Sequence, residues 1–477
     1  MSRYRGSSLL ALSTLLLLGG CATRPVNPPI THVDESSGYR YATRRQHLPQ
    51  NETLGVLTFS GGGTRAAAFS YGVLEVLRRT EVTLPDGRQG HLIDGIDVIT
   101  GVSGGSFTAL AYGLYGDKLF DTYEQDFLKR NVQGELIGSV LNPGNWGALW
   151  SPTWGRSEQA AKLYDQILFH GATYADLDRG NGPLIVVQAT DISTGSRVGF
   201  VQNFFDYICS DLNPVPLSRA AAASSAVPMA LSPVTLSNYG GTCNYDGPSW
   251  LRSITDPRNP ARPAARAIRR VQELDSYHDS KRPYIHLVDG GLADNLGMRA
   301  VLEALEEMEA LRSIGKPTPL DHIKRIVVIT VNSLSSPATN WDESESSPGD
   351  IALLIKSTGV PIDRYSYEST EQLRDIIARW NLLRSIKNSP AFSASKDPAL
   401  AQSITVPDIQ LYAIDVSFPE LKDKAEFEYL NNLPTSFVLP PEAVDRLRAA
   451  AGKILLESPD FQRLEKDTGA KVMPDPR

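Results

Sequence analysis

The chain has 477 residues, of which 41% are hydrophobic and 21% are charged, and its formal net charge is −7 at pH 7. This composition is that of a globular protein, and it excludes a wholly disordered chain, a collagen-like chain and a polytopic membrane protein. An acidic chain also lacks the charge typical of proteins that bind nucleic acids. Because only three cysteines are present, four-thiolate zinc sites and dense disulfide frameworks are excluded as well.

The first twenty residues have the features of an export signal. Arg3 and Arg5 precede a leucine-rich run over 7–18, which is too short to span a bilayer as a helix of about 20 residues. Small residues then lead to Cys21, and the segment resembles the lipobox of bacterial lipoproteins, in which this cysteine is lipidated. The alternative is an ordinary signal peptide with an incidental cysteine. Since Ala22 follows Cys21, the resemblance implies attachment at the periplasmic face of the outer membrane.

Removal of residues 1–20 takes away two arginines and no acid, so the net charge of −7 becomes −9. Such a chain has little attraction for an anionic surface, and we expect acyl chains to attach it to the membrane. Residues 21–52 are predicted to be the lipidated cysteine and a flexible tether. Export also implies an oxidising compartment, where Cys209 and Cys243 either form a disulfide or remain as two buried thiols.

From residue 53 onward, apolar runs bounded by Gly, Pro or Ser predict strands, and apolar residues at helical spacing predict helices. In chain order the predicted strands cover 54–59, 96–100, 184–189, 197–204, 284–288, 326–332 and 409–416. The predicted helices cover 66–79, 106 to about 115, 217–226 and 441–456. Because buried strands alternate with helices, we predict an α/β fold with a mostly parallel central sheet covered on both faces.

We predict one large domain over 53–460, followed by a tail over 461–477. Two segments interrupt the alternation of strands and helices, and we interpret them as insertions at about 240–283 and 335–405. The second insertion begins with a Ser/Pro/acid stretch and continues with helical patterns. It is either surface decoration or a lid or lipid-contacting cap.

The first motif surrounds Ser103, which lies in a G-x-S-x-G pattern between a predicted strand and a predicted helix. Gly101 and Gly105 flank the serine, as a crowded strand-to-helix turn that exposes a nucleophile requires. The following helix places its N-terminal N–H groups beside the hydroxyl. The pattern therefore predicts a nucleophilic serine, and the alternative is a structural glycine-rich turn.

The second motif is the run Ser-Gly-Gly-Gly-Thr-Arg over 60–65, again between a strand and a helix. Its bare backbone N–H groups suit an oxyanion or a phosphate. The same run also satisfies G-x-G-x-x-A, the dinucleotide-binding pattern, which expects an acidic residue at the end of a strand about 20 residues later. Glu81 lies near that distance but follows a helix, so the dinucleotide interpretation is disfavoured.

The third motif is Asp289-Gly290-Gly291, at the end of a predicted strand. An aspartate held there can orient and deprotonate a serine, although an Asp-Gly turn is also a common strand end. A histidine base would have to follow the acid, and only His322 does so, in a segment that favours a solvated loop. His286 lies in the same strand as Asp289 but on its opposite face. The motifs therefore favour a two-residue serine–aspartate arrangement over a triad.

These three motifs, in this order and each after a strand, resemble those of the patatin-like phospholipases. The Ala/Ser-rich segment over 218–228 adds to the resemblance, which covers roughly residues 53–300. It implies a three-layer α/β/α fold and a catalytic dyad of Ser103 and Asp289, with Arg65 holding or charging the glycine loop. The oxyanion donors that it implies are backbone N–H groups of Gly61, Gly62 and Gly63.

The resemblance implies a lipid acyl hydrolase that acts through an acyl-enzyme, with phospholipid or lysophospholipid as the expected substrate. We expect no cofactor, no metal site and no nucleic-acid partner. A general esterase or thioesterase acting on other esters would share every motif. A non-catalytic lipoprotein that scaffolds envelope partners is the alternative from a different functional class.

Overall fold

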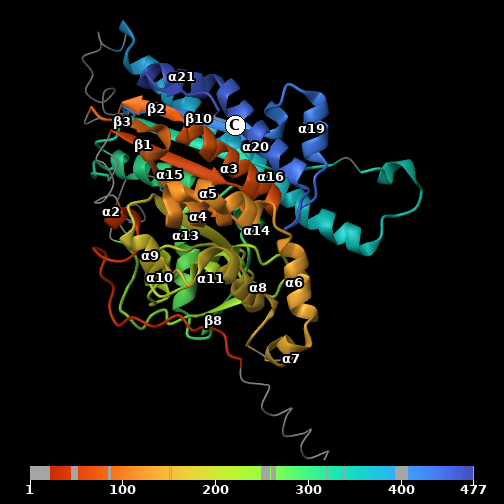
Figure 1. Ribbon diagram of the computed structural model, residues 1–477. Coiled ribbons are helices and arrows are strands. Elements are labelled where there is room, and N and C mark those ends of the chain that lie inside the picture. The colour runs from red at the N-terminus through yellow and green to blue at the C-terminus, as the bar shows by residue number, and fades with distance from the viewer. Residues whose placement is uncertain are drawn as a thin grey trace, which may run out of the picture.

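The computed structural model places most of the chain (Figure 1). It describes residues 22–44, 52–83, 87–149, 151, 153–248, 258, 265–318, 321–337, 339–390, 392 and 407–475. The predicted signal segment and Cys21 lie outside the described residues. Within the described part, we find no helix that combines the length and apolarity needed to span a bilayer.

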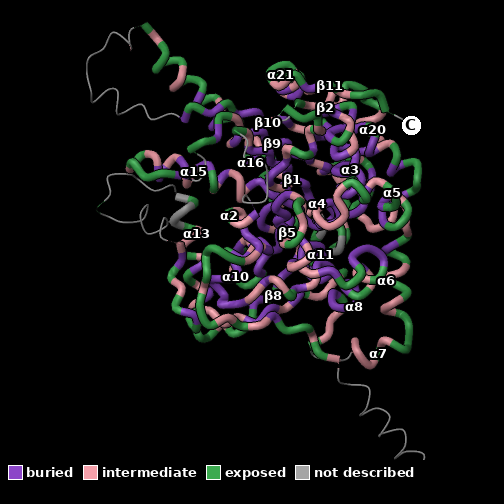
Figure 2. The backbone as a smooth tube through the Cα atoms, turned by 60° about the vertical axis from the view of Figure 1, so that its left-hand side comes forward, coloured by how far each residue is buried: buried purple, intermediate pink, exposed green. Residues whose placement is uncertain are grey.

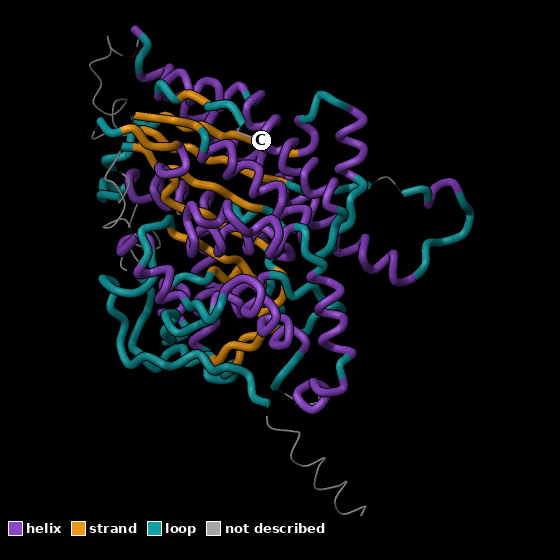
Figure 3. The backbone as a smooth tube through the Cα atoms, in the orientation of Figure 1, coloured by secondary structure: helices purple, strands orange, loops and turns teal. Residues whose placement is uncertain are grey.

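An eight-stranded sheet forms the centre of the molecule (Figure 3). In spatial order its strands are β10 (Gln410–Ser417), β9 (Arg325–Asn332), β1 (Thr53–Phe59), β4 (Ile96–Val102), β5 (Leu184–Asp191), β8 (Tyr284–Asp289) and β7 (Val234–Ser237). The first five run parallel to one another, whereas β8 is antiparallel to both of its neighbours. The short strand β6 (Ser196–Gly199) pairs antiparallel with β5. The predicted mostly parallel sheet is confirmed.

Helices cover both faces of this sheet, because alternate side chains of its buried strands point to opposite sides. In β9, Val327 and Ile329 pack into one apolar cluster, whereas Ile326 and Val328 pack into another. The helices of the first cluster include α3 (Thr64–Arg78), α4 (Gly104–Tyr115), α11 (Leu217–Ser224) and α20 (Pro441–Glu457). Those of the second are α15 (Arg299–Ser313) and α16 (Asp350–Lys387). The fold is thus a three-layer α/β/α arrangement, as predicted.

One predicted strand, over 197–204, is wrong beyond its first residues. The chain leaves the sheet after β6 and forms the helix α10 (Gln202–Tyr207). Phe204, Phe205 and Tyr207 are buried on this helix. A short apolar run fits either element by periodicity alone, and packing on the neighbouring elements decides between them.

The segment that we predicted to be a flexible tether packs on the domain over much of its length. Tyr39 is fully buried, and its hydroxyl accepts a hydrogen bond from the Ile185 N–H at 2.7 Å. Arg40 forms a buried ion pair with Asp206 at 2.9 Å. Residues 22–44 are therefore a part of the fold, and the tether prediction is wrong for them. The remainder, except Glu52, lies outside the described residues.

The residues after 460 are likewise a part of the domain and not a loose tail. Phe461 and Leu464 of α21 (Pro459–Thr468) are buried in the first apolar cluster. The chain then forms β11 (Lys471–Val472), which pairs with β2 (Thr80–Thr83) in a small separate sheet with β3 (Gln89–His91). The described domain thus extends close to the end of the chain.

The predicted insertion over 335–405 contains two parts of different character. The second half of α16 belongs to the core, since Leu373, Ile376 and Trp380 are buried against α15 and the sheet. The first half and the segment before it project away from the body, on the right of Figure 1 in turquoise. Of the insertion at 240–283, the helix α13 (Ala265–Asp275) is described, and Tyr277 after it is fully buried.

Cys209 and Cys243 are joined in a disulfide, with their Cα atoms 5.6 Å apart. Both cysteines are buried. The bridge ties the end of α10 to the start of the segment that precedes α13. The two cysteines are 34 residues apart in the sequence, and the disulfide closes the loop between them.

We expect the variant Cys209→Ala/Cys243→Ala to lose about 3–4 kcal/mol in the free energy of unfolding, because the unfolded chain gains loop entropy. Urea denaturation of the oxidised wild type and the variant measures the difference. Reduced wild type is the control and should show a similar loss. Equal stability of all three forms would contradict the prediction.

Candidate active site

Ser103 lies at a sharp turn between β4 and α4, with backbone angles of φ 48° and ψ −120°. A non-glycine residue with positive φ is strained, and the surrounding contacts must hold it there. The Ser103 N–H donates to the Ser224 hydroxyl at 2.8 Å, and the Ser103 carbonyl accepts from the Ser106 hydroxyl at 2.6 Å. The side chain is buried. The G-x-S-x-G segment thus has the geometry of a nucleophile elbow.

The glycine loop after β1 lies directly against this turn. A Cβ atom on Gly104 would collide with the Gly63 carbonyl, and one on Gly105 would lie 2.6 Å from the Ser60 carbonyl oxygen. A Cβ atom on Gly61 would lie 3.4 Å from the Ser103 Cβ. Side chains are excluded between the two loops, so the backbone of one faces the serine of the other.

The N–H groups of the three loop glycines are not equivalent. The Gly61 N–H donates to the Asn295 carbonyl at 3.0 Å, so it is not free to bind an oxyanion. In the described part of the chain, the N–H groups of Gly62 and Gly63 have no backbone acceptor. The prediction that Gly61 donates is therefore corrected: it braces the loop, and the other two glycines hold the free donors.

Arg65 braces the glycine loop from behind and does not point at Ser103. Its buried guanidinium donates to the Ser333 carbonyl at 2.8 Å, to the Leu433 carbonyl at 2.6 Å and to the Thr435 hydroxyl at 3.1 Å. Burial lowers the pKa of Arg65 to about 10. The structure thus assigns Arg65 the holding role, one of the two that the sequence left open.

Asp289 ends β8 and meets Ser103 across β5. Strand β5 pairs through Gln188 with Val102 on one side and through Ala189 with Asp289 on the other. The Asp289 side chain faces Ser103, and the interaction with this serine acts to lower the pKa of Asp289. Burial nevertheless raises the pKa of Asp289 to about 6, although the hydrogen bond from the Gly291 N–H also acts in the opposite direction.

The backbone around Asp289 is fixed by three further contacts. The Asp289 N–H donates to the Ala226 carbonyl at 3.0 Å, and the Gly290 N–H donates to the Ser224 carbonyl at 3.0 Å. A Cβ atom on Gly290 would collide with the Gln188 carbonyl. Glycine is therefore required at 290, and the acid is held by the end of α11 as well as by its own strand.

Two residues of the site were missed from the sequence as site residues. Ser224 accepts from the Ser103 N–H, and its hydroxyl donates to the Gln188 carbonyl at 2.6 Å, so it links the elbow to β5. Asn295 places its Oδ1 next to Gly61 and Gly291, where their Cβ atoms would lie 2.6 and 3.0 Å from it. Only the Ala/Ser-rich pattern before Pro228 and the position of Asn295 after the Asp-Gly-Gly motif hinted at these roles.

His286 and His322, the two histidines considered as a possible base, both lie away from this site. His286 is exposed, and its Nδ1 lies 3.0 Å from the Thr235 hydroxyl. His322 is exposed before the N-terminal end of β9. Ser103 follows the C-terminal end of β4, and since β9, β1 and β4 are parallel, these two residues lie at opposite edges of the sheet.

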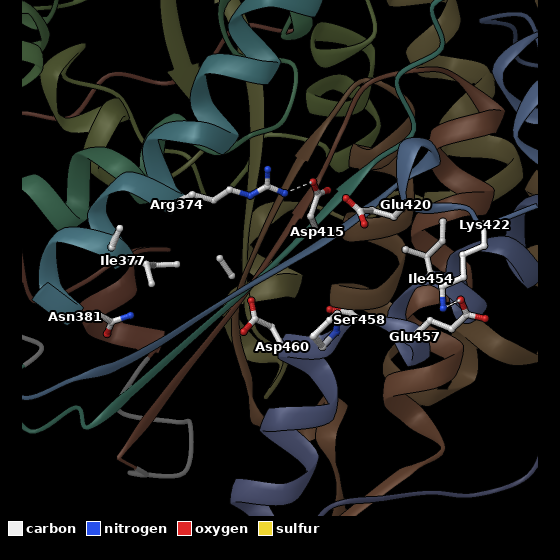
Figure 4. Close-up of a pocket in the computed structure, with 13 residues that line it drawn as sticks. Arg374, Ile377, Asn381, Asp415, Glu420, Lys422, Ile454, Glu457, Ser458 and Asp460 are labelled. Carbon is white, nitrogen blue, oxygen red and sulfur yellow. Dashed lines mark hydrogen bonds and ion pairs between the residues drawn. The ribbon is translucent and has the colours of Figure 1, made fainter. Parts of the chain in front are cut away.

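A groove of about 660 Å³ lies elsewhere, along the edge strand β10 (Figure 4). Burial raises the pKa of Asp415 in this groove to about 6. The carboxylate is, however, 3.3 Å from Arg374, and Lys422 is 2.9 Å from Glu457. These charges are paired with one another, and no nucleophile of the three motifs lines the groove, so we do not assign it a catalytic role.

Comparison with known families agrees with this geometry. Residues 57–302, which contain all three motifs, match the model of the family described as patatin-like phospholipase. The chain belongs to the patatin-like phospholipase family. This is a family of lipid acyl hydrolases, and the match confirms the resemblance seen in the sequence. Comparison with curated proteins gives no significant sequence match.

Solved structures with a similar chain path include human GIVD cytosolic phospholipase A2, with a TM-score of 0.44 and 14% identity over 94% of this chain. Another is VipD from Legionella pneumophila, with a TM-score of 0.26, 12% identity and coverage of 97% of this chain and 74% of VipD. The present chain spans 66% of the human chain. Similarities this distant do not transfer the properties of those proteins to the present chain.

The raised pKa of Asp289 predicts a dependence of stability on pH. A carboxyl whose pKa is higher in the folded than in the unfolded chain stabilises the fold below the unfolded pKa, and this stabilisation is lost as pH rises through about 6. Asp289→Asn should therefore be more stable than wild type at pH 8 by about 1–3 kcal/mol. Urea denaturation should show this gain shrinking toward zero at pH 4.

Glu428→Gln, which alters an exposed carboxylate, is the matched control and should show no such gain. An Asp289→Asn variant that is equally stable to wild type at pH 8 would argue against a desolvated carboxylate at 289.

Proposed function

We propose that this protein is a serine-dependent lipid acyl hydrolase that cleaves carboxylic esters of phospholipid or lysophospholipid. The observation that carries the proposal is the placement of Ser103, on its strained turn, next to the Asp289 carboxylate across β5. A base whose pKa lies near neutrality can accept a proton and return it within one catalytic cycle. Membership of a family of lipid acyl hydrolases supports the substrate class.

In the acylation step, Asp289 takes the proton of the Ser103 hydroxyl while Oγ adds to the ester carbonyl. The tetrahedral intermediate then collapses, the bond to the alcohol breaks, and the leaving oxygen receives the proton from Asp289. The fatty acyl group remains on Ser103 as an ester. In deacylation a water molecule loses a proton to Asp289 and adds to this ester. The bond to Oγ then breaks, Asp289 returns the proton to Oγ, and the fatty acid is released.

The negative charge that develops on the carbonyl oxygen is stabilised by the N–H groups of Gly62 and Gly63. These donors are held in place by Arg65 and by the bond from Gly61 to Asn295. The N-terminus of α4 adds a positive partial charge beside Ser103. Loss of one donor in such a site typically lowers the rate by about 10² to 10³.

Labelling with a fluorophosphonate tests the nucleophile directly. Wild type should be labelled at Ser103, and Ser103→Ala should not be labelled at all, because the reacting oxygen is absent. Asp289→Asn should be labelled at least ~100-fold more slowly, since the proton acceptor is lost. For wild type, kcat/KM should fall as pH decreases below about 6, where Asp289 becomes protonated.

Labelling that persists in Ser103→Ala would overturn the proposal. A general esterase or thioesterase would use the same dyad, so hydrolysis of long-chain phospholipid should be compared with that of a short-chain nitrophenyl ester. A preference for the soluble ester, even when the phospholipid is dispersed in detergent, would favour this alternative. A non-catalytic scaffold would hydrolyse neither substrate.

We also propose that the protein is an exported lipoprotein, attached through Cys21 to the periplasmic face of the outer membrane. The signal-like segment and the small residues before Cys21 support this location. Metabolic labelling with palmitate in a Gram-negative host should mark wild type and leave Cys21→Ser unmarked. Incorporation of label into the variant would refute lipidation at this residue.

A further inference from the structure

We propose that three segments around the active site form one surface that inserts into a lipid bilayer. The segments, which we call the apolar rim, are residues 132–149, 227–230 and 351–362. The inference rests on the proposed function, because it names the physical state of the substrate: lipid within a bilayer. It differs from attachment through Cys21, which lies outside these segments.

The first segment contains α6 (Val132–Leu141) and α7 (Pro143–Leu149). Ile137 and Leu141 lie one helical turn apart on α6, and Leu141 is 67% exposed. Trp146 of α7 is also exposed, and its indole N–H donates to the Val140 carbonyl at 3.3 Å. The segment therefore presents large apolar side chains to solvent, although its other side packs on the domain.

This segment begins at the glycine loop. The Gln133 N–H donates to the Phe437 carbonyl at 3.2 Å, and the Gln133 Oε1 accepts from the Phe437 N–H at 3.1 Å and from the Ser436 hydroxyl at 2.9 Å. The Ser436 carbonyl in turn accepts from the Thr64 N–H at 2.8 Å, next to Gly63. Two consecutive contacts thus connect α6 to the oxyanion donors.

The second segment begins at Asp289. The Ala226 carbonyl accepts the Asp289 N–H, and residues 227–230 directly after it are all exposed. They include Val227 and Met229, of which Met229 is 63% exposed and has a φ of 72°. A strained, exposed methionine thus follows, by three residues, the Ala226 carbonyl that accepts the Asp289 N–H.

The third segment follows Ser333 in the chain, and Ser333 contacts the glycine loop. The Ser333 N–H donates to the Ser60 hydroxyl at 3.0 Å, and the Ser333 hydroxyl donates to the Gly61 carbonyl at 3.3 Å. The chain then projects from the body and enters α16 (Figure 1). Leu353, Leu354 and Val360 are exposed on this projecting half of the helix.

The charge pattern identifies a bilayer as the occupant. In residues 132–149 the one charged side chain is Glu135, which is paired with Arg130 at 2.7 Å. Residues 351–362 carry one charge, Lys356, and the exposed acids Asp342, Glu343, Glu345 and Asp350 lie before them on the projecting stretch. Residues 227–230 carry no charge. A protein partner that binds specifically is expected to present polar groups that pair with its target, whereas lipid tails accept apolar side chains without any such pairing.

The arrangement of the segments agrees with one flat partner. Helices α6 and α7 and the projecting start of α16 lie on the same side of the molecule in Figure 1. Figure 2 shows α6 and α7 at the periphery, away from the buried centre. Contiguous exposed apolar groups mark interaction sites, and tryptophan suits the boundary between water and lipid. The contacts described above link these segments to the glycine loop or to Asp289, so a bilayer that touches them reaches the site.

Vesicle sedimentation tests the surface separately from catalysis. The full-length chain with Ser103→Ala and Cys21→Ser, which removes turnover and any acyl anchor, is mixed with phosphatidylcholine vesicles. We expect binding that resists 0.5 M salt, as apolar insertion requires, and a loss of at least ~10-fold in affinity when Ile137→Ser/Leu141→Ser or Leu353→Ser/Leu354→Ser is added.

Leu382→Ser/Ile386→Ser is the matched control, because both side chains are exposed on the far half of α16. This variant should bind like its parent. Unchanged binding by both rim variants would overturn the proposal, and so would equal weakening by the control. Binding that disappears at 0.5 M salt would identify an electrostatic contact in place of insertion.

Kinetics separate a failure of this inference from a failure of the proposed function. In chains with Ser103 intact, the rim variants should lose at least ~10-fold in the rate on vesicle phospholipid and keep the wild-type rate on a soluble short-chain ester. Equal rates on vesicles would overturn the rim alone. If wild type hydrolyses neither substrate, the proposed function fails, while sedimentation still decides the rim.

Discussion

The close approach of two backbones, at the ends of β1 and β4, is the constraint on which the active site depends. The glycine loop and the serine turn meet where a Cβ atom on Gly104 would collide with Gly63. The contact brings the backbone of the glycine loop beside the serine turn, because adjacent parallel strands end at the same edge of the sheet. Arg65, Asn295 and Ser224 then hold the two loops in register.

A buried cation, Arg65, and a partly buried anion, Asp289, flank this contact, and their surroundings differ. The guanidinium of Arg65 donates to two carbonyls and a hydroxyl, which compensates for its desolvation. The Asp289 carboxylate accepts a hydrogen bond from the Gly291 N–H, but desolvation outweighs this bond and the effect of Ser103, so its pKa is raised. The cation stabilises the loop, whereas the anion is left poorly solvated, as a proton acceptor near neutral pH must be.

Sequence reasoning succeeded where structure is local. The strand–turn–helix context of Ser103 and the strand before Asp289 follow from apolar runs and glycines within about ten residues. It failed for segments whose structure depends on distant partners. Tyr39 and Phe461 are buried by residues far away in the sequence. The segments around them are polar and have no regular apolar spacing, so nothing in the sequence indicated this burial. Likewise, the pattern over 335–405 did not reveal that only half of α16 would reach the core.

The sequence by itself determined the three motifs of the candidate site: a serine between glycines, a glycine loop and an Asp-Gly-Gly end, each following a strand. Tertiary structure alone decided how they meet. Asp289 reaches Ser103 because β8 enters the sheet antiparallel beside β5, and Gly61 is excluded as a donor because Asn295 occupies its N–H. Residue type sets what a turn can do, whereas strand order and packing set which turns come together.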